Sequence, residues 1–377
     1  MERRLIPVNG VLDLATADGL NPAPLADAAV PTKTFVLEVH TPDPDRYLED
    51  LAGPGNVEPT EDAYLSRIPG PADDDLFWVD RLDPRFWIFH TVMPSTHAGH
   101  WLHERVESRR DTDWMWLPSD HLRYISQDAV SHKVRTEFDG TRLVGFDEAA
   151  EGLKVQLTGT HADRLFDRIA QIPEYSSAVS FDSVEVAVDD PDLGVLREAV
   201  KRRESFAASG ENFVHHAQFV RTVVDRYAWL VEGIEGFALR FDPCRPPDSQ
   251  GQPTEPAGGA TYGGAPIGIK FSRQIPDLTR FCAELFSARA PFRLWGRPVL
   301  VDNNATVEAV DLHVGQRLRI DIGIDWIRVY LRAGSCGNSV ARLICNLQHR
   351  FDSALRPTHH QLADLVTLRK LTSARSD

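Results

Sequence analysis

The stretch "FVLEVHTPDPDRYLEDL", residues 35–51, decides the fold class, because an apolar strand pattern passes through a polar turn into a short helix. Asp45 lies at the start of that helix, where exposed N–H groups and the helix dipole favour a carboxylate. The same order recurs in "LKVQLTGTHADRLFDRI" (153–169) and, less closely, in "IGIKFSRQIPDLTRFCAEL" (267–285). The pattern predicts three strand-helix units, which are either a structural repeat or convergence on one β-α unit.

The residues after the first unit extend the prediction to layers. "LFWVDRL" and "RFWIFHTV" are aromatic-rich strand patterns joined by a turn at Asp83-Pro84, and "STHAGHWLHERVESRR" follows as a helix. This order is typical of a ferredoxin-like α+β sandwich with antiparallel strands. A parallel nucleotide-binding sheet is not expected, because no GxGxxG and no GxxxxGK[ST] is present. We therefore expect an α+β fold of two or three ferredoxin-like modules, each an antiparallel sheet with helices.

The length of 377 residues is enough for two or three domains, and composition suggests where they divide. "PCRPPDSQGQPTEPAGGATYGGA" is rich in Pro and Gly and predicts a linker between modules. The expected parts are an extended N-terminal arm (1–32), a first α+β module with an aromatic core (33–150), a second, helix-rich α+β module (151–242), a flexible linker (243–265), a basic C-terminal α+β module (266–355) and a tail (356–377).

Composition also narrows the class of protein. No apolar run reaches the roughly 18–20 residues that cross a bilayer, and the N-terminus lacks the apolar core of a secretory signal. The four cysteines include no CxxC pair, which indicates reduced thiols and a cytoplasmic protein. No membrane association is expected.

The charge is unevenly distributed along the chain. Residues 266–377 hold 16 of the 41 Lys and Arg residues and 10 of the 55 Asp and Glu residues, which gives +6, against −20 for the residues before them. The basic part either attracts the acidic part or meets an acidic partner, a protein surface or nucleic acid. In "RLRIDIGIDWIRVYLR" the alternation predicts a half-solvated sheet face, with binding candidates Arg317, Arg319 and Arg328. Pairing of these arginines with Asp on a solvated face is the alternative.

The turn "RAGSCGNSV", residues 332–340, joins a strand pattern to a helical one. Cys336 is a weak candidate nucleophile, because a thiol at a helix N-terminus is more acidic but needs a base. No nearby residue supplies that base: His349 lies more than three helical turns away, and His313 could approach only through folding. The exposed N–H groups also suggest an anion site with Arg332, Ser335 and Asn338, or simply a helix that Ser335 caps.

A second candidate is the histidine group His97, His100 and His103 in "HAGHWLHE". His100 and His103 could share a metal ion with Glu104 or His90, but no HExxH is present and free imidazoles on a helix surface are the alternative.

No motif supplies a nucleophile, a base and oxyanion donors together. We therefore expect a non-enzymatic binding or assembly subunit of a multi-protein complex, without a cofactor, that forms hetero- or homo-oligomers. Its C-terminal sheet would contact the acidic partner. Two alternatives stay open: a hydrolase or nuclease-like enzyme whose site is assembled from dispersed His, Asp and Glu, and a sensor of a small anionic ligand.

Overall fold

The structure is a computed structural model that describes residues 32–73, 75–144, 152–203, 205–210, 213–243, 249–250 and 260–367. Outside these residues lie all but the last residue of the expected N-terminal arm (1–32), most of the expected linker (243–265) and the last part of the expected tail (356–377). The two ends of the linker are described: β12 (Arg240–Pro243) pairs antiparallel with β13 (Ala260–Gly263).

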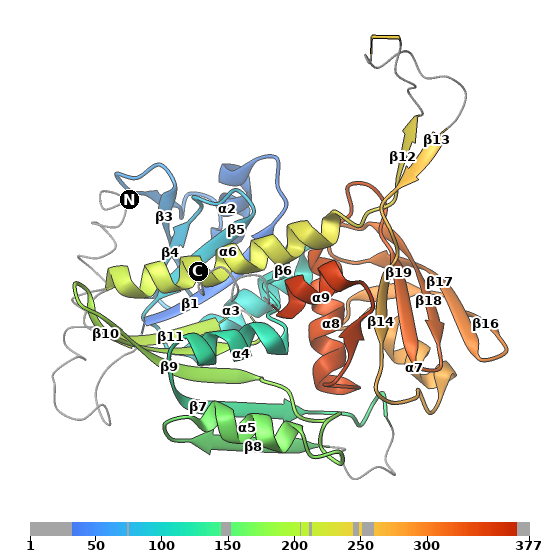
Figure 1. The fold of residues 1–377 in the computed structure, drawn as a ribbon. Helices are drawn as coiled ribbons and strands as arrows, with labels where there is room; N and C mark the ends of the chain where they lie inside the picture. The colour runs from blue at the N-terminus through green and yellow to red at the C-terminus, as the bar shows by residue number, and fades with distance from the viewer. Residues whose placement is uncertain are drawn as a thin grey trace.

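An antiparallel sheet of eleven strands is the larger layer of the described chain (Figure 1). Its order is β2 (Glu58–Pro59), β3 (Leu65–Pro69), β4 (Leu76–Asp80), β5 (Phe86–Thr91), β1 (Thr32–Val39), β11 (Ser205–Gly210), β10 (Gly194–Lys201), β9 (Ser183–Asp190), β7 (Val130–Phe138) and β8 (Leu153–Thr158), with β6 (Thr112–Trp114) paired to β1. All eight residues of β1 are buried, and strands pair with it on both edges. Strands from before and after the expected module boundary at residue 150 belong to this one sheet, since β8 pairs with β7.

Five helices accompany this sheet: α2 (Pro44–Ala52), α3 (Ser95–Ser108), α4 (Ser119–Asp128), α5 (Ala162–Ala170) and α6 (Phe213–Glu235). The predicted strand-then-helix order is found in all three units, as β1–α2, β8–α5 and β14 (Ile267–Lys270)–α7 (Leu278–Leu285). Asp43 rather than Asp45 caps α2, since its side chain accepts from the Arg46 N–H at 3.1 Å. Asp277 caps α7 in the same way, accepting from the Arg280 N–H at 3.0 Å.

A second antiparallel sheet of seven strands is formed by the C-terminal part of the described chain. Besides β14 it contains β15 (Leu294–Gly296), β16 (Val299–Val301), β17 (Asn304–Asp311), β18 (Arg317–Gly323), β19 (Trp326–Tyr330) and β20 (Arg356–Pro357). The predicted α+β class with antiparallel sheets is therefore confirmed.

Helix α8 (Asn338–Arg350) joins the two sheets, and all but its last residue are buried. The Gln348 side chain accepts from the Ser119 N–H at 3.0 Å, and Arg342 Nε donates to the Phe292 carbonyl at 2.9 Å. One large apolar core accordingly includes residues of both sheets, of α6, of α8 and of α9 (His360–Thr367). In Figure 1, α6 passes across the larger sheet toward the smaller one. Within the described residues no helix has both the length and the apolar character needed to cross a membrane.

Candidate metal centre

Four side chains from distant parts of the chain meet where the two sheets approach each other. They are Glu38 near the end of β1, His40 just after it, His313 in the turn between β17 and β18, and Cys336 in the turn before α8. One ligand atom of each lies within 4.8 Å of one ligand atom of every other. Glu38, His313 and Cys336 are buried, whereas the His40 side chain is 31% exposed. We call this group the metal cluster.

The short strand β6 and the residues before it hold the cluster together. Glu38 pairs with Asp113 in the register of β1 with β6, and the His40 N–H donates to the Asp111 carbonyl at 2.8 Å. On the other side, the Val314 N–H donates to the Arg110 carbonyl at 2.5 Å. One segment, residues 110–113, therefore fixes both the strand that carries Glu38 and the turn that carries His313.

Glu38 is the centre of the hydrogen bonds in the cluster. Its carboxylate accepts from Arg85 Nε at 2.6 Å and lies 2.9 Å from His313 Nε2 and 3.3 Å from His40 Nε2. Burial alone would raise the pKa of Glu38, but the hydrogen bonds to both histidines and the charges of His313 and Arg85 hold it well below its usual range. Glu38 is therefore an anion, as a metal ligand must be.

Protons would compete with a metal ion for His313 and Cys336. Burial lowers the pKa of His313, but the hydrogen bond and charge of Glu38 outweigh it, so that this pKa is raised. Burial and the charge of Glu38 raise the pKa of the Cys336 thiol well above its usual value, although Arg85 opposes them. Without a metal ion, Cys336 is a neutral thiol that donates toward Glu38.

One ring nitrogen in the cluster, His313 Nδ1, is buried without a hydrogen-bond partner among the described residues. The other candidate imidazole, His40, has its Nε2 3.3 Å from the Glu38 carboxylate. A buried nitrogen normally has a partner, so His313 Nδ1 fits a site that is completed by another group. Carboxylate oxygen, imidazole nitrogen and thiolate sulfur are together the donors that Zn²⁺ accepts. The donor set and the unpaired His313 nitrogen both fit zinc.

Arg85 closes one side of the cluster without adding net charge to it. Its guanidinium also pairs with Glu235 at the end of α6, where Nη2 lies 2.6 Å from Oε1. The same Glu235 oxygen accepts from the Gly337 N–H at 2.8 Å. A divalent ion with the anions of Glu38 and Cys336 would thus be neutral, beside an Arg85–Glu235 pair that is already balanced.

A buried ion-pair network holds the turn that carries His313. The Asp311 carboxylate accepts from the His313 N–H at 2.9 Å, and Arg342 of α8 pairs with both Asp311 and Asp113. Asp113, Asp311 and Arg342 are all fully buried. This network ties α8, β17 and β6 together, so that the turn carrying His313 has one fixed position.

At the turn before α8, the backbone and side chains that were expected to form an anion site or a helix cap bond to other parts of the protein. Ser335 does not cap the helix: its Oγ accepts from the Arg332 N–H at 3.1 Å, and α8 begins at Asn338 without a side-chain cap. The N–H groups of Cys336 and Gly337 donate to Gln316 and Glu235. Asn338 is buried and bonds to Tyr227 and to the Trp114 carbonyl, because the α8 N-terminus packs between the sheets.

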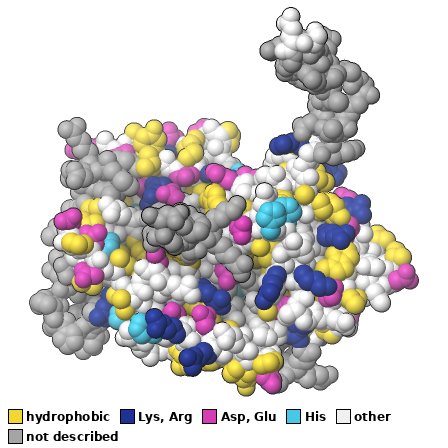
Figure 2. Space-filling view, in the orientation of Figure 1, with side chains coloured by type: hydrophobic (Ala, Val, Ile, Leu, Met, Phe, Trp, Pro, Cys, Tyr) yellow, Lys and Arg dark blue, Asp and Glu magenta, His cyan; other side chains and the backbone are white. Residues whose placement is uncertain are grey.

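The basic face of the C-terminal sheet is exposed, and several of its arginines have partners. Arg319 bonds to Asp321 at 3.1 Å and lies over Tyr330, while Arg328 lies over Trp326. Arg317 is exposed, and Arg332 lies 3.6 Å from Glu308. A cavity of about 390 Å³ is lined by Arg319, Tyr330 and Arg332 with three neighbours. Figure 2 shows Lys and Arg among hydrophobic side chains over this part of the molecule.

The three histidines of α3 do not meet in the structure. His100 pairs with Glu104 at 3.3 Å and His103 pairs with Glu107 at 3.1 Å; in each pair the glutamate lies one helical turn after the histidine. The His103 ring also stacks on Trp114, whereas His97 is exposed. Among the described residues, these histidines belong to no group of side chains close enough to share a metal ion, unlike the members of the metal cluster.

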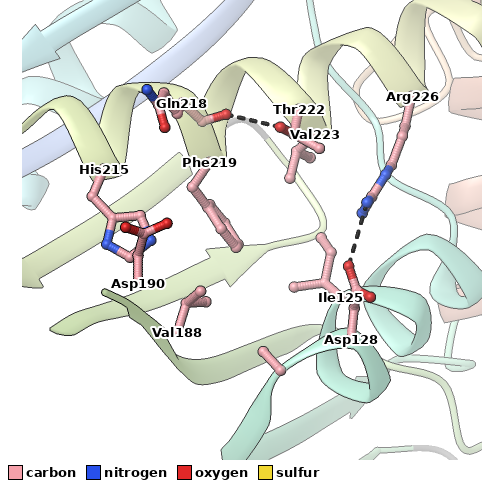
Figure 3. Close-up of a pocket in the computed structure, with 11 residues that line it drawn as sticks. Ile125, Asp128, Val188, Asp190, His215, Gln218, Phe219, Thr222, Val223 and Arg226 are labelled. Carbon is pink, nitrogen blue, oxygen red and sulfur yellow. Dashed lines mark hydrogen bonds and ion pairs between the residues drawn. The ribbon is translucent and has the colours of Figure 1, made fainter. Parts of the chain in front are cut away.

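Another cavity, of about 230 Å³, lies between α4, β9 and α6 (Figure 3). Ile125, Val188 and Phe219 give it apolar walls, and Arg226 reaches Asp128 at one end. The His215 ring at the other end bonds to the Gly194 carbonyl.

Sequence reasoning missed Glu38 and His40, although both lie in the stretch that decided the fold. The signal was a carboxylate and an imidazole two residues apart, and hence on the same side, in an otherwise apolar strand. A buried Glu in such a strand needs partners. The sequence gives no indication that these partners are His313 and Cys336.

Comparisons with known proteins give a family and a relative. A family model described as "MJECL33-like protein" matches residues 27–363. A relative from Methanocaldococcus jannaschii, named "Uncharacterized protein MJECL33", is 25% identical over 369 residues, which cover 85% of this chain and 84% of the relative. No solved structure matches the chain.

Proposed function

The chain belongs to the MJECL33-like protein family, and for this member we propose a metal-dependent hydrolase whose zinc ion is held by the metal cluster. The observation that carries the proposal is the meeting of Glu38, His40, His313 and Cys336 within 4.8 Å. The site is assembled from dispersed residues, as the hydrolase alternative from the sequence required.

The ligand set supports a catalytic rather than a structural zinc. Structural zinc sites are usually built from Cys with some His and are closed by four protein ligands. This cluster has a single Cys, and one of its four side chains, His40, is 31% exposed. Binding through three of the four side chains leaves one coordination position for water. A zinc ion held by these residues would act as a Lewis acid and would lower the pKa of a bound water to about 7.

The other residues around the cluster position and balance it. Arg85 holds the Glu38 carboxylate, and Glu235 balances the charge of Arg85. Asp311 holds the backbone of the turn that carries His313. These contacts keep the candidate ligands in place before a metal ion arrives, which lowers the cost of binding.

Elemental analysis of protein purified without chelator tests the proposal. We expect about one zinc ion per chain, loss of the ion in His313→Ala, and retention in His100→Ala, a control that removes an exposed histidine of α3. Hydrolysis of bis(p-nitrophenyl) phosphate and p-nitrophenyl acetate should stop after chelation and return with added zinc. Native protein without bound metal, or activity that survives chelation, would contradict the proposal.

A second candidate is a binding subunit that uses the basic C-terminal module, and the cavity lined by Arg319, Tyr330 and Arg332 favours it. An acidic protein or nucleic acid would then bind with an affinity that falls steeply with salt. Replacing Arg319 and Arg332 together by Ala should weaken such binding and leave the zinc content unchanged. Co-purification of a partner with wild type but not with this variant tests it, and equal co-purification rejects it.

A further inference from the structure

A cavity of about 220 Å³ is lined by three arginines and borders the turn that carries His313 of the metal cluster. Arg109 and Arg110 follow the end of α3, and Arg293 comes from the loop before β15. Leu312, also in the wall, is the chain neighbour of His313. The acidic residue of the wall, Glu107, pairs with His103. We call this space the arginine cavity.

The backbone of the arginine cavity is bonded directly to the segment that carries one of the candidate zinc ligands, His313. The Leu312 N–H donates to the Arg293 carbonyl at 2.9 Å, and the Val314 N–H donates to the Arg110 carbonyl at 2.5 Å. These two bonds flank His313 on either side. The position of His313 and the shape of the arginine cavity therefore depend on the same hydrogen bonds.

Backbone strain is concentrated around this cavity. Ala288 and Arg293 in its wall have φ values of 65° and 54°, and Val314 has 57°. They are three of the five non-glycine residues with positive φ in the described chain. For a β-branched residue such as Val314 this conformation is a clear outlier. Strained residues persist where surrounding structure holds them, and they cluster at functional sites.

The three arginines are held so that donors remain for a ligand. Arg293 is 8% exposed, and its guanidinium donates to the carbonyls of Arg109 at 2.7 Å and Thr112 at 3.2 Å. Arg109 uses Nε and Nη2 on Asp111, which leaves Nη1. Arg110 is exposed and forms no ion pair with a described residue. Each guanidinium has five N–H donors, and these contacts use only some of them.

We infer that the arginine cavity binds a phosphate group of the substrate, which places a small phosphate-bearing molecule at the zinc centre. This inference rests on the proposed hydrolase. Planar guanidinium groups match phosphate oxygens, and three of them suit a dianion with several acceptors better than a single carboxylate. A compact cavity suits a small molecule, since proteins bind single-stranded nucleic acid along an extended basic groove with stacking aromatic side chains.

Calorimetric titration of the zinc-loaded protein with inorganic phosphate tests the inference. We expect binding that weakens with salt, and a loss of about tenfold or more in Arg110→Ala, because a charge-assisted contact is removed. Arg164→Ala is the matched control: it removes an exposed arginine of α5 that lines none of the cavities described above, and it should bind phosphate like wild type.

The outcomes separate this inference from the proposed hydrolase. Zinc-loaded protein that shows no phosphate binding, or binds it equally well in Arg110→Ala, overturns the arginine cavity and leaves the hydrolase standing. Tighter binding of a single-stranded oligonucleotide than of phosphate, lost in Arg110→Ala, overturns the assignment to a small molecule. Absence of zinc from native protein in elemental analysis contradicts the hydrolase itself, whatever the phosphate titration gives.

Discussion

The Cys336 sulfur lies 3.4 Å from each carboxylate oxygen of Glu38, although 298 positions separate the two residues. β1 carries Glu38 into the middle of the larger sheet, and the turn before α8 brings Cys336 to it from the smaller one. A buried thiol beside a buried carboxylate is a poor pair unless protons or a metal ion balance it. The predictions below follow from that balance and from the packing around it.

Zinc affinity should rise as the pH rises. Zinc needs the thiolate of Cys336 and neutral His313, and the pKa of each is raised, so that protons compete with the ion for both side chains. Release of both protons would increase the affinity by up to about 100-fold per pH unit. Competition with a chromophoric chelator between about pH 6 and 8 measures this dependence.

Two variants check the source of that pH dependence. Cys336→Ser should lose zinc affinity, whereas Cys282→Ser should keep both affinity and pH dependence, because Cys282 lies outside the metal cluster. An affinity that does not change with pH would contradict the assignment of His313 and Cys336 as ligands.

Metal-free protein should show a pH dependence of stability in two directions. The depressed pKa of Glu38 gives stability that is present above about pH 4.3, its unfolded value, and is lost as the pH falls toward the folded value. The raised pKa of His313 gives stability that is complete below about pH 6.5 and is lost as the pH rises through the folded value. Urea unfolding of the stripped protein should therefore lose its alkaline decline in His313→Gln.

Arg342→Met should strongly destabilise the protein. The substitution leaves the buried carboxylates of Asp113 and Asp311 without their shared cation, and breaking a buried pair from one side costs about 3–5 kcal/mol. A triple variant that adds Asp113→Asn and Asp311→Asn should recover much of the loss, because no uncompensated charge remains. Denaturant unfolding measures both, and a triple variant no more stable than Arg342→Met would argue against this explanation.

Two threonines of β1 should differ sharply when each is replaced by Val. Thr34 bonds to His90 at 2.8 Å and to His216 at 2.7 Å, and His216 continues the chain to Glu198. Thr34→Val leaves two buried ring nitrogens without a partner, at about 1–3 kcal/mol each. Thr32 is also buried, but its hydroxyl has no partner among the described residues, so Thr32→Val should cost little. Equal melting temperatures of the two variants would show that the hydrogen-bonded chain is not stabilising.

Gly337→Ala should disturb the metal cluster through packing alone. A Cβ at this position would lie 2.2 Å from the Val231 carbonyl oxygen of α6, and neither backbone can move freely. We expect a loss of about 1–3 kcal/mol and weaker zinc binding, since Cys336 is the preceding residue. Gly152→Ala meets no atom within 4 Å and is the control. Thermal melting and zinc content of the two variants measure both effects, and equal values for Gly337→Ala and Gly152→Ala would contradict the prediction.

Local sequence patterns were enough to predict the α+β class and the three strand-helix units, but not every element. The order at residues 35–51 is found as β1 and α2 because alternation, polar turns and helix-opening Asp residues act over a few positions. The cap at Ser335 was not found, since Glu235 of α6 takes the Gly337 N–H instead. The metal cluster could not be predicted because its four members lie in three separate stretches. Only the pairing of β6 with β1 and the docking of α8 bring them together.

The distance in sequence between Glu38 and Cys336 also affects the order of folding. Closing so long a loop costs entropy that later contacts must repay, so the docking of α8 is expected to be a late step. A ribosome that stops before residue 336 releases a chain with at most three of the four ligands. Zinc retention would then report complete synthesis and correct docking, and cellular quality control could distinguish finished molecules from truncated ones by the stability that the ion adds.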